Sequence, residues 1–306
     1  MRAARLHLDQ ALMGQGVLGA LVAAGGGCDV DLRDLGPALR LWSRPQGLGQ
    51  LRERLRRDFP ASAGPALVFS GSGDFHHVSP ILLQRALEIA GGPQVTVLHF
   101  DNHPDWTPFA NGAHCGSWVS WAARMANVAR VITVGVSSAD LRRPSARNAD
   151  LGLLAEQRLE LYAYRGSDGE ASVELGGQSW PTIAAMGEAT FAAFLADRVE
   201  TDAIYITIDK DVLRTGEAAA GRDHGETSLA FLKNLIAPLL ATHHLIGADV
   251  VGDWSPAIYG GGPLARLMKR GEALLDHPWG RPSAQVRAAN EDVNLELLDL
   301  IAGGAR

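Results

Sequence analysis

Six short apolar runs recur along the chain, and helical patterns fall between several of them. The runs are rich in Val, Ile and Leu with few polar positions, which is typical of strands covered on both faces of a sheet. They are Ala66–Ser70, Val95–Phe100, Val131–Val136, Leu159–Tyr164, Ile204–Ile208 and Leu245–Val251. The helical segments are Pro80–Ala90, Gly116–Asn127, Thr190–Val199, Ser228–Leu240 and Pro263–Leu275. This alternation predicts an α/β fold with a mainly parallel central sheet.

The chain shows no internal repeat and no shift in composition that would separate two halves, so we expect a single domain over residues 1–306. The stretches Arg165–Gln178 and Arg214–Glu226 are polar and predict surface loops. The stretch Ala11–Gly27 is apolar, but glycines interrupt it and it is too short to span a bilayer. We interpret it as a buried N-terminal element, with a signal peptide as the alternative.

The composition and net charge of the chain exclude some kinds of binding partner. Hydrophobic residues make up 46% of the chain and charged residues 20%, which excludes disorder as the main state. The net charge is −6 and the basic residues are scattered, so we expect neither a nucleic-acid partner nor a membrane partner. Two cysteines, Cys28 and Cys115, are too few for a disulfide framework and fit a reducing compartment. We therefore expect a cytoplasmic protein.

Three clusters of acidic and imidazole side chains directly follow predicted strands. They are segments 101–105 (Asp-Asn-His-Pro-Asp), 209–211 (Asp-Lys-Asp) and 73–77 (Gly-Asp-Phe-His-His). Alternate side chains of an extended chain share a face, so the carboxylates and the imidazole of segment 101–105 converge. Parallel strands end at one edge of a sheet, where such sheets bind ligands. Clustered carboxylates are costly without a neutralising cation, which indicates a site for divalent ions.

Each motif also has a structural interpretation. An Asp-x-Asp pair after a strand commonly forms a turn or caps a helix. The Asp-x-His-x-Asp pattern is different, because capping does not require two carboxylates and an imidazole on one face. We interpret His99, inside its strand, as a hydrogen-bonded core residue. The doublet His243-His244 begins a strand and is expected at the far end of the sheet.

The three clusters, in this order, resemble the motifs of the ureohydrolase (arginase/agmatinase) family. Segment 97–105 is especially similar to the agmatinase branch. Segment 112–116 (Gly-Ala-His-Cys-Gly) resembles the family's loop with a histidine before glycine, and segment 247–251 (Gly-Ala-Asp-Val-Val) resembles its late Asp-Val-Val strand. The resemblance covers roughly residues 66–256. It implies an arginase-like domain of three layers, with helices flanking both faces of the sheet.

The resemblance also implies a centre with two Mn²⁺ ions per chain. One ion would be held by His76, Asp101, Asp105 and Asp209, and the other by His103, Asp101, Asp209 and Asp211. Asp101 and Asp209 would then bridge the two ions. Carboxylate oxygens with one imidazole per ion suit Mn²⁺ better than a metal that prefers thiolates.

The reaction implied by the resemblance is an attack of a metal-bridging hydroxide on a guanidine or amidine carbon, followed by loss of an amine. Asp105 would pass the proton of the nucleophile to that amine. His114 resembles the proton-shuttling histidine of the family. A structural role for His114, as a cap of the helix that starts near Gly116, is equally compatible with its place in a loop.

Two motifs depart from the family pattern. In the first, Phe75 stands where the ligand histidine is usual, so one insertion moves that role to His76, and His77 remains an alternative. In the second, Lys210 lies between the two ligand carboxylates. Strand alternation turns it away from the metals, toward Asp74 or a loop carboxylate.

The most serious departure follows the Asp-Val-Val strand. Family members with guanidine substrates have a glutamate there that receives the guanidinium, whereas this chain has Gly252. We expect Asp253 to substitute for that glutamate as a catalytic and substrate-binding residue. Trp106, beside the metal motif, is expected either to pack beneath a loop or to bind substrate by stacking on a planar cation.

The expected function is manganese-dependent hydrolysis of a linear C–N bond, other than a peptide bond, in a small guanidino or amidino compound. One alternative is a formimidoyl or amide hydrolase on the same metal site. Another is a non-catalytic metal-binding protein of the same fold, which Gly252 and Arg214, in place of the usual closing aspartate, suggest. The resemblance also implies a homo-oligomer.

Overall fold

The computed structural model describes residues 1–59, 61, 64–142, 148–166, 169–220, 223–276 and 282–304. The strands are β1 (Arg2–His7), β2 (Cys28–Asp31), β3 (Trp42–Ser43), β4 (Ala66–Phe69), β5 (Val95–Phe100), β6 (Ala113–His114), β7 (Val128–Val136), β8 (Leu159–Ala163), β9 (Ser172–Leu175), β10 (Gln178–Pro181), β11 (Ala203–Asp209) and β12 (His244–Val251). The helices are α1 (Gly16–Ala24), α2 (Gly36–Leu39), α3 (Pro45–Asp58), α4 (Ser79–Ile89), α5 (Trp118–Ala123), α6 (Leu151–Ala155), α7 (Ile183–Met186), α8 (Glu188–Arg198), α9 (Leu229–Thr242), α10 (Pro263–Asp276) and α11 (Ala284–Gly304).

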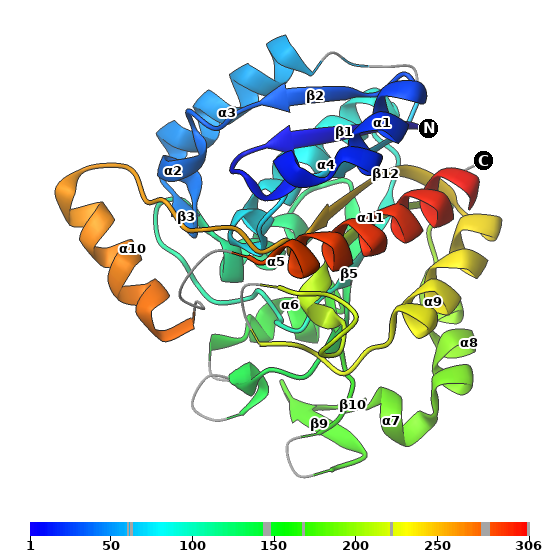
Figure 1. Cartoon of the computed structure of the whole chain (residues 1–306). Helices are drawn as coiled ribbons and strands as arrows, with labels where there is room; N and C mark the ends of the chain where they lie inside the picture. Colours follow the sequence, from blue (N-terminus) through cyan, green and yellow to red (C-terminus); the bar gives the residue numbers. More distant parts are fainter. Residues whose placement is uncertain are drawn as a thin grey trace.

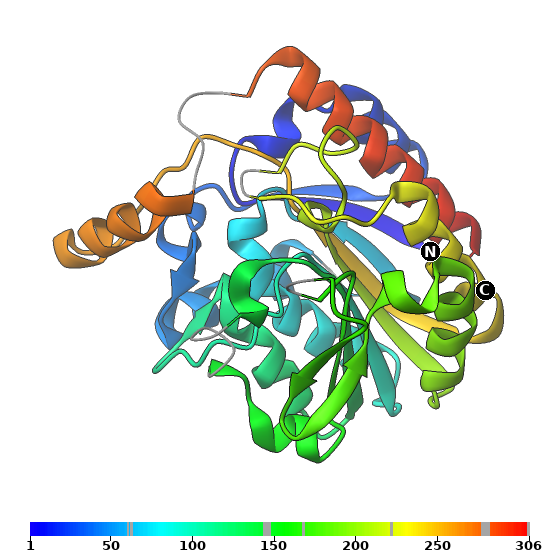
Figure 2. The ribbon, with the colours of Figure 1, turned by 90° about the horizontal axis from the view of Figure 1, so that it is seen from below.

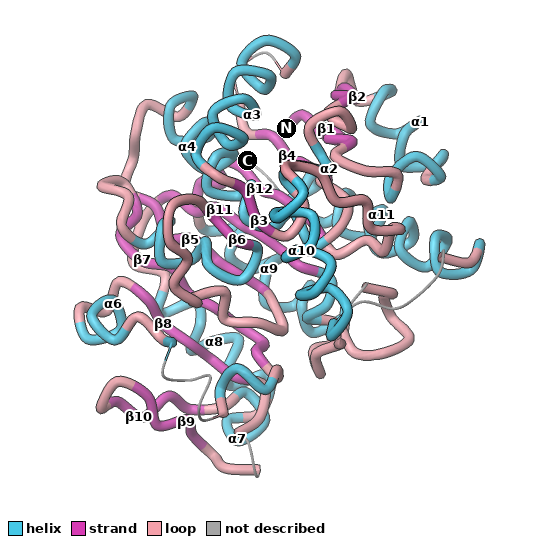
Figure 3. Tube along the Cα trace, turned by 90° about the vertical axis from the view of Figure 1, so that its left-hand side faces the viewer, coloured by secondary structure: helices cyan, strands magenta, loops and turns pink. Residues whose placement is uncertain are grey.

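Eight strands form one sheet in the order β2-β1-β4-β12-β11-β5-β7-β8 (Figure 3). Every neighbouring pair in this sheet is parallel. Figure 3 shows its strands fanning from β2 to β8. The predicted parallel α/β sheet is therefore confirmed, and all six predicted runs are strands of it.

Helices cover both faces of the sheet. On one face α1, α11, α9 and α8 pack in succession, while α4 and α5 pack on β12 and β7 on the other (Figure 2). This confirms the three-layer architecture. Helix α10 stands apart from both layers (Figure 1). Among the helices of the described residues, none is both long enough and apolar enough to cross a bilayer.

The chain order places the predicted clusters side by side. Strands β11 and β12 come late in the sequence but lie between β4 and β5. The segments that leave β5 and β11 therefore meet at the same edge, with the 3-10 helix Gly73–Val78 after β4 close by. This arrangement brings together side chains that are far apart in the sequence.

The sequence missed elements at both ends of the chain. Strand β1 reads Arg-Ala-Ala-Arg-Leu-His, so charged positions hide its apolar face. The expectation of a buried element over Ala11–Gly27 was wrong in part: α1 buries Leu18 and Val22 but exposes Val17 and Leu21. The sequence thus predicted strands only where a run was continuously apolar.

The first predicted loop, Arg165–Gln178, also needed correction, because it contains β9 and the start of β10, which pair as a hairpin. The second, Arg214–Glu226, carries only isolated bridges among its described residues. Residues 167–168 and 221–222 of these two stretches lie outside the described residues.

Candidate metal centre

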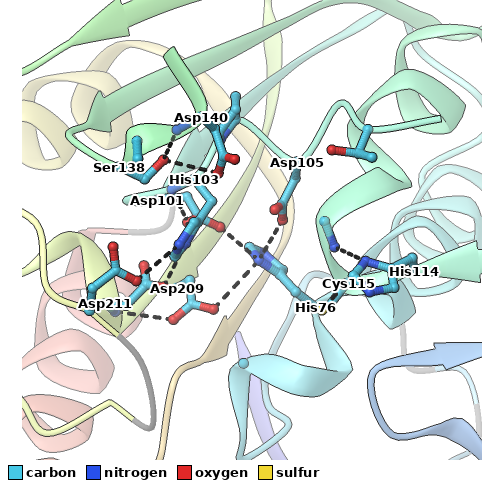
Figure 4. A pocket seen from close by; sticks show the side chains of 16 residues that line it. His76, Asp101, His103, Asp105, His114, Cys115, Ser138, Asp140, Asp209 and Asp211 are labelled. Carbon is cyan, nitrogen blue, oxygen red and sulfur yellow. Dashed lines mark hydrogen bonds and ion pairs between the residues drawn. The ribbon is translucent and has the colours of Figure 1, made fainter. Parts of the chain in front are cut away.

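A pocket of about 470 Å³ opens at the carboxyl edge of the sheet, where β5, β11 and the Gly73–Val78 helix end (Figure 4). It brings together all six side chains expected as metal ligands, which are His76, Asp101, His103, Asp105, Asp209 and Asp211. Ligand-type atoms fall in two groups, each within 4.8 Å: one contains His76, His99, Asp101 and Asp105, and the other Asp101, His103 and Asp211. Asp101 belongs to both groups, as a bridging ligand would.

His76 faces three carboxylates at once. Its Nδ1 lies 3.0 Å from Asp101 Oδ2, 3.4 Å from Asp105 Oδ2 and 3.8 Å from Asp209 Oδ2. None of these approaches has hydrogen-bond geometry, so this buried nitrogen has no hydrogen-bond partner among the described residues. Its Nε2 lies 2.9 Å from Thr207 Oγ1, and donation there leaves the Nδ1 lone pair for an ion.

His77, the alternative ligand, lies elsewhere. It does not line the pocket, and neither of its ring nitrogens has a hydrogen-bond partner among the described residues. Burial lowers the pKa of His77 to about 3, so its ring is neutral at physiological pH. The structure thus brings His76, and not His77, to the carboxylates.

His99 is a buried, hydrogen-bonded histidine, as expected, but it also contacts the cluster. Its Nδ1 lies 3.0 Å from Thr133 Oγ1 and its Nε2 lies 2.9 Å from Asp101 Oδ2. This contact could have been predicted from the sequence, because strand alternation puts residues 99 and 101 on one face. His99 therefore orients the Asp101 carboxylate.

His103 joins the second group of ligand atoms. Its Nδ1 lies 3.0 Å from Asp211 Oδ2 and 3.4 Å from Asp101 Oδ1. Its Nε2 lies 3.2 Å from Asp223 Oδ1. Asp223 lies on an exposed loop, and no sequence pattern indicated that it would reach the site. The backbone N–H of Asn102 donates to Asp211 Oδ1 at 3.1 Å and ties the two motifs together.

The carboxylates repel one another in this buried place. Burial and the neighbouring carboxylates Asp211 and Asp101 raise the pKa of Asp209 well above its ordinary value. Burial and Asp101 raise the pKa of Asp211 to about 6, against the opposing effect of His103. A bound cation would reverse these shifts, because it stabilises the ionised carboxylates.

The two imidazoles shift in the opposite sense to a simple buried histidine. Burial alone would lower the pKa of His76, but Asp101 and Asp105 hold it well above the ordinary value. Asp211 and Asp101 do the same for the pKa of His103, again against burial. Protons thus occupy the cluster in the absence of metal, and a metal ion would have to displace them.

Asp105 and His114 form the opposite wall of the pocket (Figure 4). Asp105 takes a left-handed backbone conformation (φ 48°), and Trp118 Nε1 donates to its Oδ2 at 2.7 Å. His114 Nδ1 accepts from the Gly116 N–H at 2.8 Å, so the helix-capping role considered for His114 is present. His114 also lines the pocket, so the same side chain caps the helix and borders the pocket.

The loop after β7 contributes pocket residues that the sequence analysis missed. Ser138 and Asp140 line the pocket, and Ser138 Oγ donates to Asp140 Oδ2 at 3.1 Å. Their position just beyond the carboxyl end of a parallel strand is the feature of the sequence that could have indicated a place in the pocket.

Asp253 does not reach the pocket, which corrects the expectation that it substitutes for the family's glutamate. Its carboxylate is 2% exposed and accepts from Lys210 Nζ at 2.8 Å and from Gln15 Nε2 at 2.8 Å. Asn294 Nδ2 donates to its other oxygen at 3.3 Å. These bonds hold the side chain beneath the Asp209–Asp211 turn, away from a substrate.

Of the two partners expected for Lys210, the structure brings it to a loop carboxylate, that of Asp253 in the loop after β12, and not to Asp74. Asp74 pairs instead with Arg40 at 2.7 Å. Trp106 is 1% exposed, packs in the main hydrophobic core and does not line the pocket. Its large apolar ring is stabilised there by burial. The packing interpretation of Trp106 therefore fits, and the substrate-stacking one does not.

Comparison with known proteins gives one family. Residues 61–258 match the model of the Arginase family. None of the curated proteins matches the sequence. Solved structures match over almost the whole chain at low sequence identity, so their likeness concerns the fold.

Three of these structures illustrate the range. Proclavaminate amidino hydrolase from Streptomyces clavuligerus has a TM-score of 0.61 at 14% identity, covering 99% of this chain and 92% of that one. Arginase from Bacillus subtilis has a TM-score of 0.59 at 13% identity, covering 99% of each chain. Formimidoylglutamase from Bacillus subtilis subsp. subtilis str. 168 has a TM-score of 0.58 at 14% identity, covering 99% of this chain and 86% of that one.

Proposed function

This chain belongs to the arginase family, and on that premise we propose that it is a binuclear manganese hydrolase. Its reaction would be the cleavage of a linear C–N bond, other than a peptide bond, in a small guanidino or amidino compound. The convergence of six ligand-type side chains in one pocket supports this function most directly.

The donor set fits two hard divalent cations. It contains four carboxylates and two imidazoles, with Asp101 common to both groups of ligand atoms. The buried Nδ1 of His76 is aimed at three carboxylate oxygens without hydrogen-bond geometry, as a ligand of a shared ion would be. One ion would be held by His76, Asp101, Asp105 and Asp209, and the other by His103, Asp101, Asp209 and Asp211. When bound, the two ions would lower the pKa of a coordinated water and so supply a nucleophile near neutral pH.

The chain's own residues would bind and orient the substrate. Asp140 and Asp223 add carboxylates to the pocket beyond the six ligands, and an acidic pocket favours a cationic guanidinium or amidinium over an anion. Asp105, held by Trp118, and His114 face each other across the wall that would receive the leaving amine. They are the groups placed to move its proton.

A second reaction is also compatible with the site, because Gly252 and the buried Asp253 leave this edge of the sheet without the family's guanidinium-binding carboxylate. A neutral amide needs no such carboxylate, and a metal-activated hydroxide does not itself require a guanidine. One structural neighbour is a formimidoylglutamase. Hydrolysis of a formimidoyl or amide compound is therefore the alternative activity.

Mn²⁺ reconstitution separates these activities. We expect the purified chain to take up two Mn²⁺ per chain and to hydrolyse at least one compound in a panel of guanidino, amidino, formimidoyl and amide compounds. Release of urea would favour a guanidine substrate, whereas ammonia, formamide or a carboxylic acid would favour the alternative. Metal binding without turnover over the whole panel would instead indicate a non-catalytic protein.

Two variants test the centre itself. Asp101→Asn and Asp211→Asn should abolish both tight metal uptake and turnover, because each removes a carboxylate charge from the cluster. Asp34→Asn is the matched control: this exposed carboxylate binds Arg54 and lies outside the pocket. Full turnover after chelation, with elemental analysis showing no metal, would contradict the proposal.

A further inference from the structure

His114 is bonded at both ring nitrogens. Its Nδ1 accepts from the Gly116 N–H, and Cys115 Sγ lies 3.8 Å from the same atom. Its Nε2 forms an ion pair with Glu272 Oε1 of helix α10. In the neutral ring Nδ1 accepts, so the single ring proton lies on Nε2 and is donated to Glu272. The carboxylate thus selects the tautomer of His114.

Gly116 keeps a narrow gap open between His114 and Asp105. A Cβ placed on Gly116 would lie 3.3 Å from His114 Nδ1 and 3.8 Å from Asp105 Oδ1. The Nδ1 atom and the carboxylate therefore border the same small space in the pocket wall. This is the arrangement required of two groups that exchange protons with one leaving group.

Glu272 reaches His114 from a helix that stands outside the layers of the fold. Helix α10 is anchored by Lys269, whose Nζ donates to Ala38 O at 2.7 Å and lies 4.5 Å from the centroid of the Trp42 ring. Lys269 is buried, whereas Leu264 and Leu267 on the same helix are 70% and 68% exposed. This anchor and the burial of Ala273 against Trp42 and Cys115 hold α10, and hence Glu272, in place.

Glu272 also lies beyond residues 61–258, which match the family model. The family's own carboxylate position is closed here by Gly252, and Asp253 is bound to Lys210. A carboxylate of a different element thus stands beside the pocket histidine. Its side chain is 35% exposed, so it borders solvent as well as His114.

We propose that Glu272 is a positioning residue for proton transfer by His114, and that the docking of α10 is therefore part of the active site. Glu272 fixes the ring so that Nδ1 faces the gap shared with Asp105, and it stabilises the imidazolium that forms when Nδ1 gives up the bond from the Gly116 N–H and takes up a proton. Its catalytic part rests on the proposed function, whereas the contact between Glu272 and His114 does not.

The charges around His114 agree with this role. Burial alone would lower the pKa of His114, but Cys115 and Glu272 together raise it to about 10. The other titratable groups that face this region are His77, Lys269 and Asp105. Unlike these three groups, the Glu272 carboxylate contacts the His114 ring directly.

The test compares Glu272→Gln with the unaltered full-length chain. The titration of ¹⁵N-labelled His114, followed by NMR, should shift down by about one pH unit or more in Glu272→Gln. On the Mn²⁺-loaded chain, kcat should fall by about tenfold to a hundredfold with little change in KM, and its pH profile should move. Metal content should stay that of the unaltered chain. Glu272→Asp, which keeps the charge, should restore part of both effects.

Two further variants keep the outcome decisive. Lys269→Met removes the anchor of α10 and should reproduce the NMR shift of Glu272→Gln. Arg270→Ala changes an exposed residue of the same helix and should change nothing. An unaltered His114 titration in a folded Glu272→Gln chain would overturn the contact. An altered titration with unaltered kcat would overturn the positioning role. If the unaltered chain turned over no compound, the proposed function would fail, and the NMR result would still decide the contact.

Discussion

Gly252 closes the place where the family's guanidinium-binding glutamate stands. Its backbone is left-handed (φ 96°). A Cβ there would lie 2.4 Å from Asp209 Oδ1 and 2.5 Å from the backbone nitrogen of Lys210. Both neighbours belong to the turn that carries two expected metal ligands. Glycine is required at this position because any side chain would displace that turn.

Restoring the glutamate should therefore damage the protein. We expect Gly252→Glu to lose metal uptake and to lower the free energy of unfolding by about 1–3 kcal/mol from backbone strain alone. Elemental analysis and denaturant unfolding measure the two effects. Gly49→Ala is the control, since nothing lies within 4 Å of a Cβ there and helix α3 favours alanine. A gain of guanidine hydrolysis in Gly252→Glu would contradict this interpretation.

For single residues, the sequence predicted the side-chain directions that follow from strand alternation. Asp101, His103 and Asp105 leave one strand at spacing two, so their convergence follows from extended geometry. The role of Asp253 could not be predicted, because its partners Lys210 and Asn294 come from other elements. Lys210, which departs from the family pattern, and Asp253, which was expected to replace the family's glutamate, form one ion pair.

Four elements meet at that ion pair. Lys210 follows β11, Asp253 follows β12, Asn294 lies in α11, and Gln15 precedes α1. Lys210 Nζ also donates to Asn294 Oδ1 at 2.9 Å, and Asn294 Nδ2 donates to Gln15 Oε1 at 2.8 Å. The network holds the turn with Asp209 and Asp211 against the helical layer. A buried pair of this kind is costly to break because the remaining charge keeps no partner.

A double-mutant cycle tests this network. Lys210→Met and Asp253→Leu should each lower the free energy of unfolding by about 3–5 kcal/mol, and the double variant by less than the sum. Lys233–Glu296 is the matched control: it links α9 to α11 on the surface and should contribute about 0–1 kcal/mol. Additive losses in the Lys210–Asp253 cycle would show that the pair is not coupled.

The sequence predicted the interior elements better than the outer ones. Inner strands are apolar on both faces, so runs such as Val95–Phe100 are conspicuous. At the sheet edge β2 carries exposed aspartates, and β1 carries two arginines. The α10 segment was predicted as a helix, but its docking through a buried lysine was not, because an isolated Lys269 gives no pattern.

Most of the buried charged side chains of the described residues lie at one edge of the sheet, although Glu160 and Asp249 are buried elsewhere. In metal-free protein the raised pKa of Asp211, about 6, and of Asp209 means that the folded state holds protons there that the unfolded chain releases. The raised pKa of His76 and of His103 acts in the same direction at higher pH. The stability contributed by these groups is lost as pH rises through their folded-state pKa values.

Metal should reverse that trend. Below about pH 6.5 the lowered pKa of His77, about 3, acts in the opposite direction, so we expect the thermal midpoint of the metal-free chain to fall as the pH rises from about 6.5 to about 8. Mn²⁺ displaces the same protons, so its stabilisation should be small near pH 5 and reach about 3 kcal/mol near pH 8 at a hundredfold excess over Kd. Thermal unfolding with and without Mn²⁺ measures this difference. A stabilisation independent of pH would show that the ion binds away from this cluster.

The first fifteen residues take part in the same edge of the sheet, although they precede the stretch that matches the family. Asp9 accepts from Arg40, which also binds Asp74 beside His76, and Gln15 binds Asp253. A chain trimmed to residues 61–258 would lose strands β1, β2 and β3 together with Arg40, so the buried contacts of Asp74 and of Lys210 would be incomplete. Boundaries drawn by similarity alone are thus the wrong places to cut this protein.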